Sequence, residues 1–349
     1  MTEAAVTPPV AAAAPAAPVV VDRPIPPRGW QVIAGKELGD HLESARFAIL
    51  LIVLGLAAGI PLYLAAEQLR TLASQVSGAQ AVFLAMFSLG PKDQSIFQFD
   101  VTVQGFVGLA APLLGIAFAF DAVNGERSQG TLPRLVSQPI YRDDVINGKF
   151  AAALAVITLV LVSVVVLISG FGMLRLGIVP TFAEVIRLAL WVVVTIVYVG
   201  LWLSFGMLLS VVVHRAATAA LIGLGTWMLL AVFGNFIVQL FLAVFLPVNP
   251  TGTAEQQIAG LQLQDFILRL LPVTIYTEAT TVLLNPTVTS VATLSTINQY
   301  VQQQQQLPTF LSLDQSLLLV WPHIVVMVAI TACLFAAAYI RFMRQEVRA

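Results

Sequence analysis

Apolar blocks of about 20 residues alternate with short polar stretches along most of the chain. A helix of this length crosses the ~30 Å hydrocarbon core of a bilayer, and it satisfies its own backbone hydrogen bonds there. The pattern therefore predicts an all-α integral membrane protein with six transmembrane helices. The expected spans run over about 47–66, 104–120, 149–172, 185–212, 216–246 and 317–340.

Composition agrees with a membrane-embedded chain. Of its 349 residues, 58% are hydrophobic and 10% are charged, whereas soluble domains carry roughly 25% charged residues. So few charges could not cover the surface of a soluble domain. The net charge of -1 gives no reason to expect nucleic acid as a partner. The single cysteine, Cys333, lies in an apolar block and is interpreted as a small buried hydrophobe.

The regions before the first span differ in character. Residues 1–29 are rich in proline and alanine, which predicts a disordered cytoplasmic tail ahead of a transmembrane domain, 30–349. Residues 30–46 place apolar side chains on one half of a helical wheel and charges on the other. This pattern is typical of an amphipathic helix in the membrane interface.

Two segments between spans carry further helical patterns. Residues 79–89 are apolar but too short to span, so we expect them against the membrane or on the outside of the bundle. Residues 247–316 form a large loop rich in Thr, Gln and Asn, expected to be extracytoplasmic. Within it, 261–286 looks helical with a break at Pro272, and the run "QQQQQ" at 302–306 is interpreted as a polar loop or helix end.

The distribution of basic residues predicts the orientation, because Lys and Arg are enriched in cytoplasmic loops near the spans. If residues before the first span are cytoplasmic, twelve of the 17 basic residues fall inside and five outside. The five outside are Arg70, Lys92, Arg175, Arg187 and Arg269. We therefore expect a multi-pass protein of the cell membrane with both termini in the cytoplasm.

By this topology, residues 121–148 form the largest cytoplasmic loop. Its residues suit a short helix that contacts a partner protein. Gly125 and Gly130 bracket a charged turn. Thr131 can cap a short helix that has an apolar face and ends before Pro139. Such a helix could fill a groove of a partner protein, with charged residues bonding around it. The alternative is a connector whose charges are simply solvated.

The sequence "GERSQGTLPRLVSQPIYRDDVINGK", residues 125–149, resembles the cytoplasmic loop of type-2 ABC transporter permeases. In that family Glu-Arg, Gly-Thr, a leucine-rich turn, Ser-x-Pro, Arg and Gly-Lys recur in this order. The most similar branch is the copper-enzyme-maturation, NosY-like group. "KEL…SARF" before the first span, "LPVTIYTEATTVLLNP" and "FMRQEVRA" agree with it, so the resemblance covers roughly residues 30–349.

The resemblance implies an export-type permease subunit in which this loop forms a coupling helix docked into a separate cytoplasmic ABC ATPase. Further partners would be a second permease copy or a paralogue, and membrane lipid. ATP and Mg would be bound by the ATPase, and no cofactor by this chain. Pro133 departs from the charged or polar residue expected after Gly-Thr-Leu, which affects where the helix starts. The implied ATPase contact comprises Glu126, Arg127, Gly130, Thr131, Leu132, Leu135, Gln138, Pro139 and Arg142.

Motifs for other chemistry are missing from the sequence. No G-x-x-x-x-G-K-[ST] loop occurs, so ATP hydrolysis is expected from another polypeptide. The histidines are scattered and share no metal-ligand spacing with Cys or carboxylates. Polar residues inside the predicted spans are few, and hydrogen bonds between helices explain most of them. Asn235 and Gln239, one turn apart, are candidates for a substrate path.

Two other interpretations stay open from sequence alone. A non-ABC polytopic membrane protein, such as a receptor or assembly factor, would use 247–316 as its working surface. An intramembrane enzyme would need a carboxylate or histidine pair facing one cavity.

The predicted topology can be tested with single cysteines in a Cys333→Ser background. Cysteines at Gln129 and Gln345 should resist an impermeant thiol reagent in intact cells, because both positions are expected in the cytoplasm. A cysteine at Gln303 should react. Labelling of position 129 from outside would contradict the predicted orientation.

Overall fold

The computed structural model describes residues 29–75, 82–90, 95–96, 99–130, 141–248, 253–288 and 311–345. Several predictions fall outside these residues and stay predictions. They concern the tail up to residue 28, the glutamine run 302–306, and Thr131, Leu132, Leu135, Gln138 and Pro139 of the predicted ATPase contact.

In the described chain, five helical elements are long and apolar enough to cross a membrane. Each lies over one predicted span, which confirms a multi-pass membrane protein of the all-α class; the described chain also has one pair of two-residue strands. The sixth predicted range, 216–246, holds a bent pair, and a second bent pair passes the same test. The count of six therefore stays a prediction. The five elements are α2 (Ala45–Gln75), α4 (Val103–Ala119) with α5 (Asn124–Ser128), α7 (Arg142–Leu176), α8 (Phe182–Val212) and α14 (Leu313–Met343).

Both bent pairs break where the helical hydrogen-bond ladder is interrupted. α9 (Ala216–Trp227) passes through a π-helical turn, η1 (Met228–Val232), into α10 (Gly234–Phe245), with a bend of 52°. α11 (Ala254–Leu268) turns by 109° into α12 (Pro272–Leu284), which begins with proline. π-turns and prolines are common causes of sharp helix breaks. The predicted break at Pro272 is confirmed.

α12 is part of the bundle, although its sequence lies within the predicted 247–316 loop. Ten of its 13 residues are buried. Thr, Tyr and Glu side chains lower the apolarity of the segment, so sequence alone places it in a loop. In the structure these groups have hydrogen-bond partners on neighbouring helices, which allows the helix to be buried.

α3 (Val82–Ser88) corrects a second expectation, that residues 79–89 lie outside the bundle. Phe83, Leu84, Met86 and Phe87 are all buried in the main core. The Met86 side chain occupies space that only a glycine leaves free, because a Cβ at Gly172 would lie 2.2 Å from its sulfur. A helix too short to span still fills the core here, because four of its seven side chains are large and apolar.

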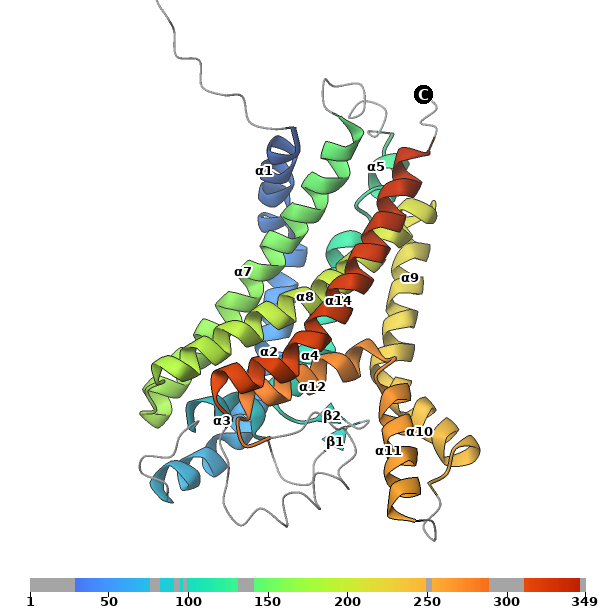
Figure 1. Ribbon diagram of the computed structural model, residues 1–349. Helices are drawn as coiled ribbons and strands as arrows, with labels where there is room; N and C mark the ends of the chain where they lie inside the picture. The colour runs from blue at the N-terminus through green and yellow to red at the C-terminus, as the bar shows by residue number, and fades with distance from the viewer. Residues whose placement is uncertain are drawn as a thin grey trace, which may run out of the picture.

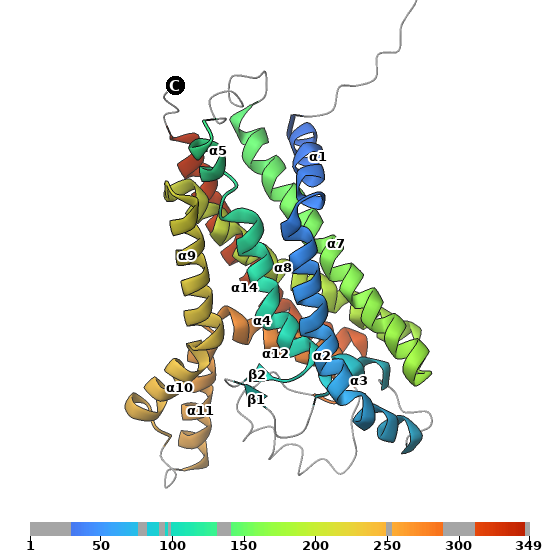
Figure 2. The same cartoon turned by 180° about the vertical axis from the view of Figure 1, so that it is seen from behind.

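Figures 1 and 2 show the long helices crossing between two ends of the bundle. One end, called here the α1 end, holds α1 (Gly29–Leu42), α5, the beginning of α7 and the end of α14. The opposite end, called the α11 end, holds α3, α10, α11 and a short antiparallel pair, β1 (Ser95–Ile96) with β2 (Phe99–Asp100).

Cys333 is exposed on α14, so the interpretation of it as buried is wrong.

α1 occupies the range predicted to lie in the membrane interface, but its apolar face meets protein. Ile33 is buried and packs against Gly148 of α7, where a Cβ would lie 2.8 Å from the Ile33 Cβ. A side chain at position 148 would push α1 away from α7. This glycine therefore sets the close approach of the two helices.

α4 and α8 cross with almost no side chain between them. A Cβ at Gly115 of α4 would lie 2.7 Å from the backbone nitrogen of Leu203 and 2.8 Å from the carbonyl oxygen of Val199. On α8, a Cβ at Gly206 would lie 2.9 Å from the Ala119 Cβ. Small residues at such crossings let helix backbones approach closely, which is how dispersion contacts hold helices together in lipid.

Gly115→Ala should destabilise the protein by about 1–3 kcal/mol, because the new methyl group overlaps rigid backbone rather than a mobile side chain. Unfolding in detergent, followed by loss of tertiary fluorescence, measures the change. Gly59→Ala in α2 is the matched control, because nothing lies within 4 Å of its Cβ position. Equal effects of the two substitutions would contradict the close crossing.

Candidate functional site

A buried lysine joins three helices at the α1 end. Lys149 of α7 has a side chain only 5% exposed, and its Nζ lies 2.8 Å from Glu37 Oε1 of α1 and 2.6 Å from Glu126 Oε1 of α5. A buried charge is tolerated only when partners replace its water. Two carboxylates do so here. The pair of bonds ties the start of the predicted coupling loop to both α1 and α7.

Further bonds hold α5 against the end of α8. Ser210 Oγ accepts hydrogen bonds from the backbone N–H groups of Val123 at 2.9 Å and Asn124 at 3.2 Å. The Asn124 side-chain amide donates to the carbonyl of Val213. These bonds satisfy backbone donors that the first turn of a helix leaves free. α5 is therefore fixed to α8 as well as to α7.

Gln345, just beyond α14, binds residues on both sides of the predicted coupling helix. Its Oε1 accepts from Arg127 Nη2 at 2.5 Å, and its backbone carbonyl accepts from Arg142 Nη1 at 3.0 Å. Its Nε2 donates to the carbonyl of Val211 at 2.7 Å. Gln345 therefore holds together Arg127 and Arg142, which lie on either side of residues 131–140 in the sequence. We call these contacts the Gln345 clasp.

The described members of the predicted ATPase contact are thus brought together at the α1 end. Glu126, Arg127 and Arg142 are half-buried and have bonding partners inside this chain. Gly130 is exposed and has φ +69°, a left-handed conformation that favours glycine and ends the α5 segment. The three charged side chains anchor the flanks of the loop, a role the sequence did not indicate.

His41 completes the packing at this end. Its ring meets Phe118 edge-on at a centroid distance of 5.1 Å. Burial lowers the pKa of the His41 imidazole below its ordinary value, because it disfavours the charged form. The contribution of this group to stability is therefore present above the ordinary histidine pKa and is lost as pH falls through the lowered value.

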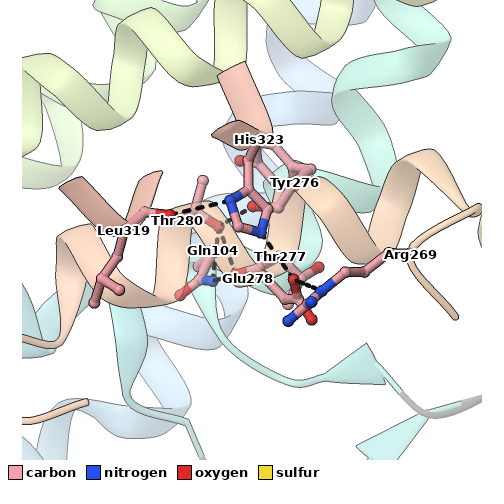
Figure 3. Close-up of polar contacts among 8 residues, drawn as sticks. All are labelled: Gln104, Arg269, Tyr276, Thr277, Glu278, Thr280, Leu319 and His323. Atoms are coloured by element: carbon pink, nitrogen blue, oxygen red, sulfur yellow. Dashed lines mark hydrogen bonds and ion pairs between the residues drawn. The ribbon is translucent and has the colours of Figure 1, made fainter. Parts of the chain in front are cut away.

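A second polar cluster lies at the level of α12, toward the α11 end (Figure 3). Glu278 of α12 has a side chain 5% exposed, and its Oε2 accepts from Arg269 Nε at 2.8 Å. The same oxygen lies 2.9 Å from His323 Nε2 of α14. His323 Nδ1 lies 3.2 Å from the carbonyl oxygen of Leu319. We call Arg269, Glu278 and His323 the acid–histidine cluster.

Neutral polar groups hold the other faces of α12. Gln104 Nε2 of α4 donates to the hydroxyls of Thr280 at 2.9 Å and Thr281 at 2.8 Å (Figure 3 includes the first). On the side of α10, Thr274 Oγ1 donates to Asn235 Oδ1 at 3.2 Å. The predicted substrate-path pair is thus split: Asn235 is half-buried against α12, whereas Gln239 is exposed.

The acid–histidine cluster was not predicted, although one signal was available. Glu278 is the single charged residue between positions 270 and 313. An isolated charge in an apolar helix marks a functional candidate in membrane proteins. Its partner lies 45 residues further on, and no spacing rule joins the two. Across the described ranges, no group of three or more His, Cys, Asp or Glu side chains could hold a metal ion.

The enzyme interpretation required a carboxylate or histidine pair facing one cavity. Glu278 and His323 do meet, and a separate small cavity lies between α2, α4, α7 and α8. Its lining is apolar apart from Thr195 and includes Leu54, Val107 and Trp191.

Lys149→Met should destabilise the protein by about 3–5 kcal/mol, because it leaves two carboxylates facing each other without their cation. Lys36→Met is the matched control, since Lys36 and its partner Asp40 are 64% and 61% exposed and such pairs contribute about 0.5 kcal/mol. Adding Glu37→Gln and Glu126→Gln to Lys149→Met should restore much of the loss. Denaturation in detergent reports all of these variants. If Lys149→Met and Lys36→Met were equally mild, the buried pair would be contradicted.

Comparison with known proteins supplies the family. The model of the family described as ABC-2 family transporter protein matches residues 31–347. The probable ABC transporter permease protein NosY of Stutzerimonas stutzeri is 29% identical over 153 residues, which is 41% of this chain and 53% of that protein. The matched part thus spans about half the length of this curated relative. This match covers most of the chain and includes Lys149, the Gln345 clasp and the acid–histidine cluster. The chain therefore belongs to the ABC-2 family of transporter proteins, as a membrane-spanning permease subunit.

Proposed function

We propose that this subunit couples ATP hydrolysis by a separate ATPase to transport, and that residues 121–148 are the docking element. The Gln345 clasp carries this proposal, because it holds Arg127 and Arg142, the described residues on either side of 131–140, to one side chain at the end of α14. Within it, contact with the ATPase is proposed for Thr131, Leu132, Leu135, Gln138 and Pro139, with the two leucines supplying apolar side chains. Glu126, Arg127, Gly130 and Arg142 shape and anchor its base.

The proposed topology puts the α1 end in the cytoplasm and the protein in the cell membrane. The α1 end carries many of the basic residues of the described chain, among them Lys36, Arg46, Arg127, Arg142 and Lys149. A bias of this kind is typical of the cytoplasmic side. Both termini then lie inside, and the α11 end faces outward.

The clasp also explains how movement of an ATPase would reach the spans. A push on 131–140 acts through Arg127 and Arg142 on the end of α14, and through Val211 on α8. Lys149 passes the same movement to α1 through Glu37. The spans α7, α8 and α14 would then shift together with α1. Alternating access requires a concerted change of this kind.

The remaining parts of the proposal follow from the family resemblance. ATP and Mg are proposed to bind the ATPase, whose partner is a pair of permease subunits formed with a second copy or a paralogue. Transport is proposed as export. A substrate path beside α10 would pass Gln239, which is exposed, and Asn235, which is bonded to α12.

Leu135→Asp should weaken binding of the ATPase tenfold or more, because an unpaired charge buried in an apolar contact costs several kcal/mol. The binding partner is the Walker-motif ATPase that co-purifies with the parent permease, and the affinity is measured with both purified. Gln129→Asp is the control, since it adds the same charge at an exposed position nearby. Unchanged affinity and unchanged permease-stimulated hydrolysis for Leu135→Asp would exclude this loop as the docking element.

A further inference from the structure

We propose that the space between α4 and α8 filled by the Tyr276 ring is a binding site for an uncharged ligand that carries a phenol-like ring. Tyr276 of α12 occupies this site when no ligand is bound. We call the space the ring slot, and its walls are Gly108 of α4 with Trp191, Thr195 and Tyr198 of α8. Taking the ligand to be the transported molecule rests on the proposed function, but the slot itself does not.

A glycine and an aromatic side chain shape the slot for a flat ring. A Cβ at Gly108 would lie 2.7 Å from Tyr276 Cε1 and 3.1 Å from Cδ1, so a larger residue there would overlap the ring. On α8, the Tyr198 ring stacks on the Tyr276 ring with a centroid distance of 4.4 Å and 18° between the planes. Aromatic rings attract one another in stacked arrangements of this kind. The slot therefore fits a flat ring, whichever molecule supplies it.

The polar groups of the slot match a hydroxyl on that ring. Thr195 Oγ1 donates its one hydrogen to the carbonyl of Trp191 at 2.8 Å, so it accepts from the Tyr276 hydroxyl at 3.1 Å. Trp191 Nε1 lies near the same hydroxyl but makes no hydrogen bond of standard geometry with the described residues, although Trp191 is only 1% exposed. A buried donor without an acceptor is costly. The slot thus offers one acceptor and one donor, and a ring hydroxyl can use both.

The charge of the walls restricts the ligand further. Glycine, threonine, tyrosine and tryptophan side chains are neutral, so the slot supplies no counter-ion. An ionised ligand would lose its hydration there without gaining an opposite charge. A neutral aromatic alcohol meets both requirements, whereas a carboxylate, an ammonium group or a metal ion does not.

The packing beside the slot allows the Tyr276 ring to leave it. The small cavity between α2, α4, α7 and α8 borders the slot, because Trp191 and Thr195 line both. Groups beside a void have no packing partner on that side, so movement there loses fewer contacts than in a filled core. α12 is held independently of this ring, by Gln104 and by the bond between Thr274 and Asn235. Rotation of the Tyr276 side chain is therefore the smallest change that empties the slot.

Tyr276 acts as a tethered competitor of the ligand. A ligand binds only those molecules in which the slot is empty, so its apparent affinity falls in proportion to that fraction. Any substitution that weakens the hold of the slot on the Tyr276 ring should therefore raise the affinity for the ligand. This gain distinguishes a binding site from a core position, where removal of a buried ring only lowers stability.

Binding of 4-fluorophenol tests the proposal, because this probe has the ring and the hydroxyl of tyrosine. It is measured with the full-length permease in lipid nanodiscs, from the broadening of the fluorine NMR signal. The parent should bind weakly. Tyr276→Phe should bind more tightly, since the internal ring loses its bond to Thr195, and Tyr276→Ala most tightly, by about tenfold or more over the parent. Equal binding by all three proteins, or binding by none, would overturn the proposal.

A second substitution locates the probe. In the Tyr276→Ala background, Gly108→Ala places a methyl group where the ring carbons lie, so binding should fall to the level of empty nanodiscs. Gly200→Ala is the matched control, because no atom lies closer than 3.9 Å to its Cβ position. Binding that survives Gly108→Ala, or is lost with Gly200→Ala, would contradict the slot.

The role of the hydroxyl is tested with Thr195→Val, which removes the acceptor. It should weaken binding of 4-fluorophenol by about threefold to tenfold and leave binding of fluorobenzene unchanged, because fluorobenzene has no hydroxyl. An equal loss for both probes would refute recognition of the hydroxyl. Tyr276→Phe with and without Thr195→Val provides the same comparison if Tyr276→Ala does not fold.

These measurements are independent of the docking proposal, since the nanodiscs contain no ATPase. If Leu135→Asp left ATPase binding unchanged, the docking element would be refuted and the results for the slot would stand. If 4-fluorophenol did not bind, the slot would be refuted and the Leu135→Asp experiment would keep its meaning.

Discussion

An ionised side chain inside an apolar bundle is costly unless protein groups take the place of water around it. The structure meets this constraint differently at each site. Lys149 is paired with two carboxylates. Arg187, 5% exposed, is surrounded by the Ser316 hydroxyl and by backbone carbonyls. Glu184 accepts from the backbone N–H groups of Phe83 and Thr181. Each solution joins segments that are distant in sequence, so the buried charges also fix how the helices assemble.

α14 links the Gln345 clasp to the acid–histidine cluster. His323 and Gln345 are 22 residues apart, which corresponds to about 33 Å along a helix. One end of this stretch binds the flanks of the proposed docking segment, and the other contacts α12. Much of the remaining α14 surface faces outward, because only 11% of its apolar 18-residue stretch is buried inside the bundle. Its position therefore depends on a few polar contacts at these two levels and on its packing against α8 and α12.

The sequence predicts the spans well, because hydrocarbon thickness sets the length of an apolar block regardless of tertiary contacts. It misplaces α3, since a short apolar helix has the same composition whether it lies on the bundle or fills its core. α12 is missed as a buried element, because its threonines and Glu278 read as polar until their partners are known. The partners of Lys149 lie on two other helices, one of them 112 residues away. Contacts between distant residues of this kind leave no periodicity in the sequence.

The crossing of α4 and α8 has a consequence for how the protein can move. Packed side chains can exchange rotamers and let two helices slide, but a crossing made by Gly115 against backbone atoms has no rotamer to exchange. Sliding one helix past the other would require lifting the two apart and losing the dispersion contacts between them. We therefore expect α4 and α8 to move as a single piece. A movement that reaches α8 from the α1 end would then carry α4 with it.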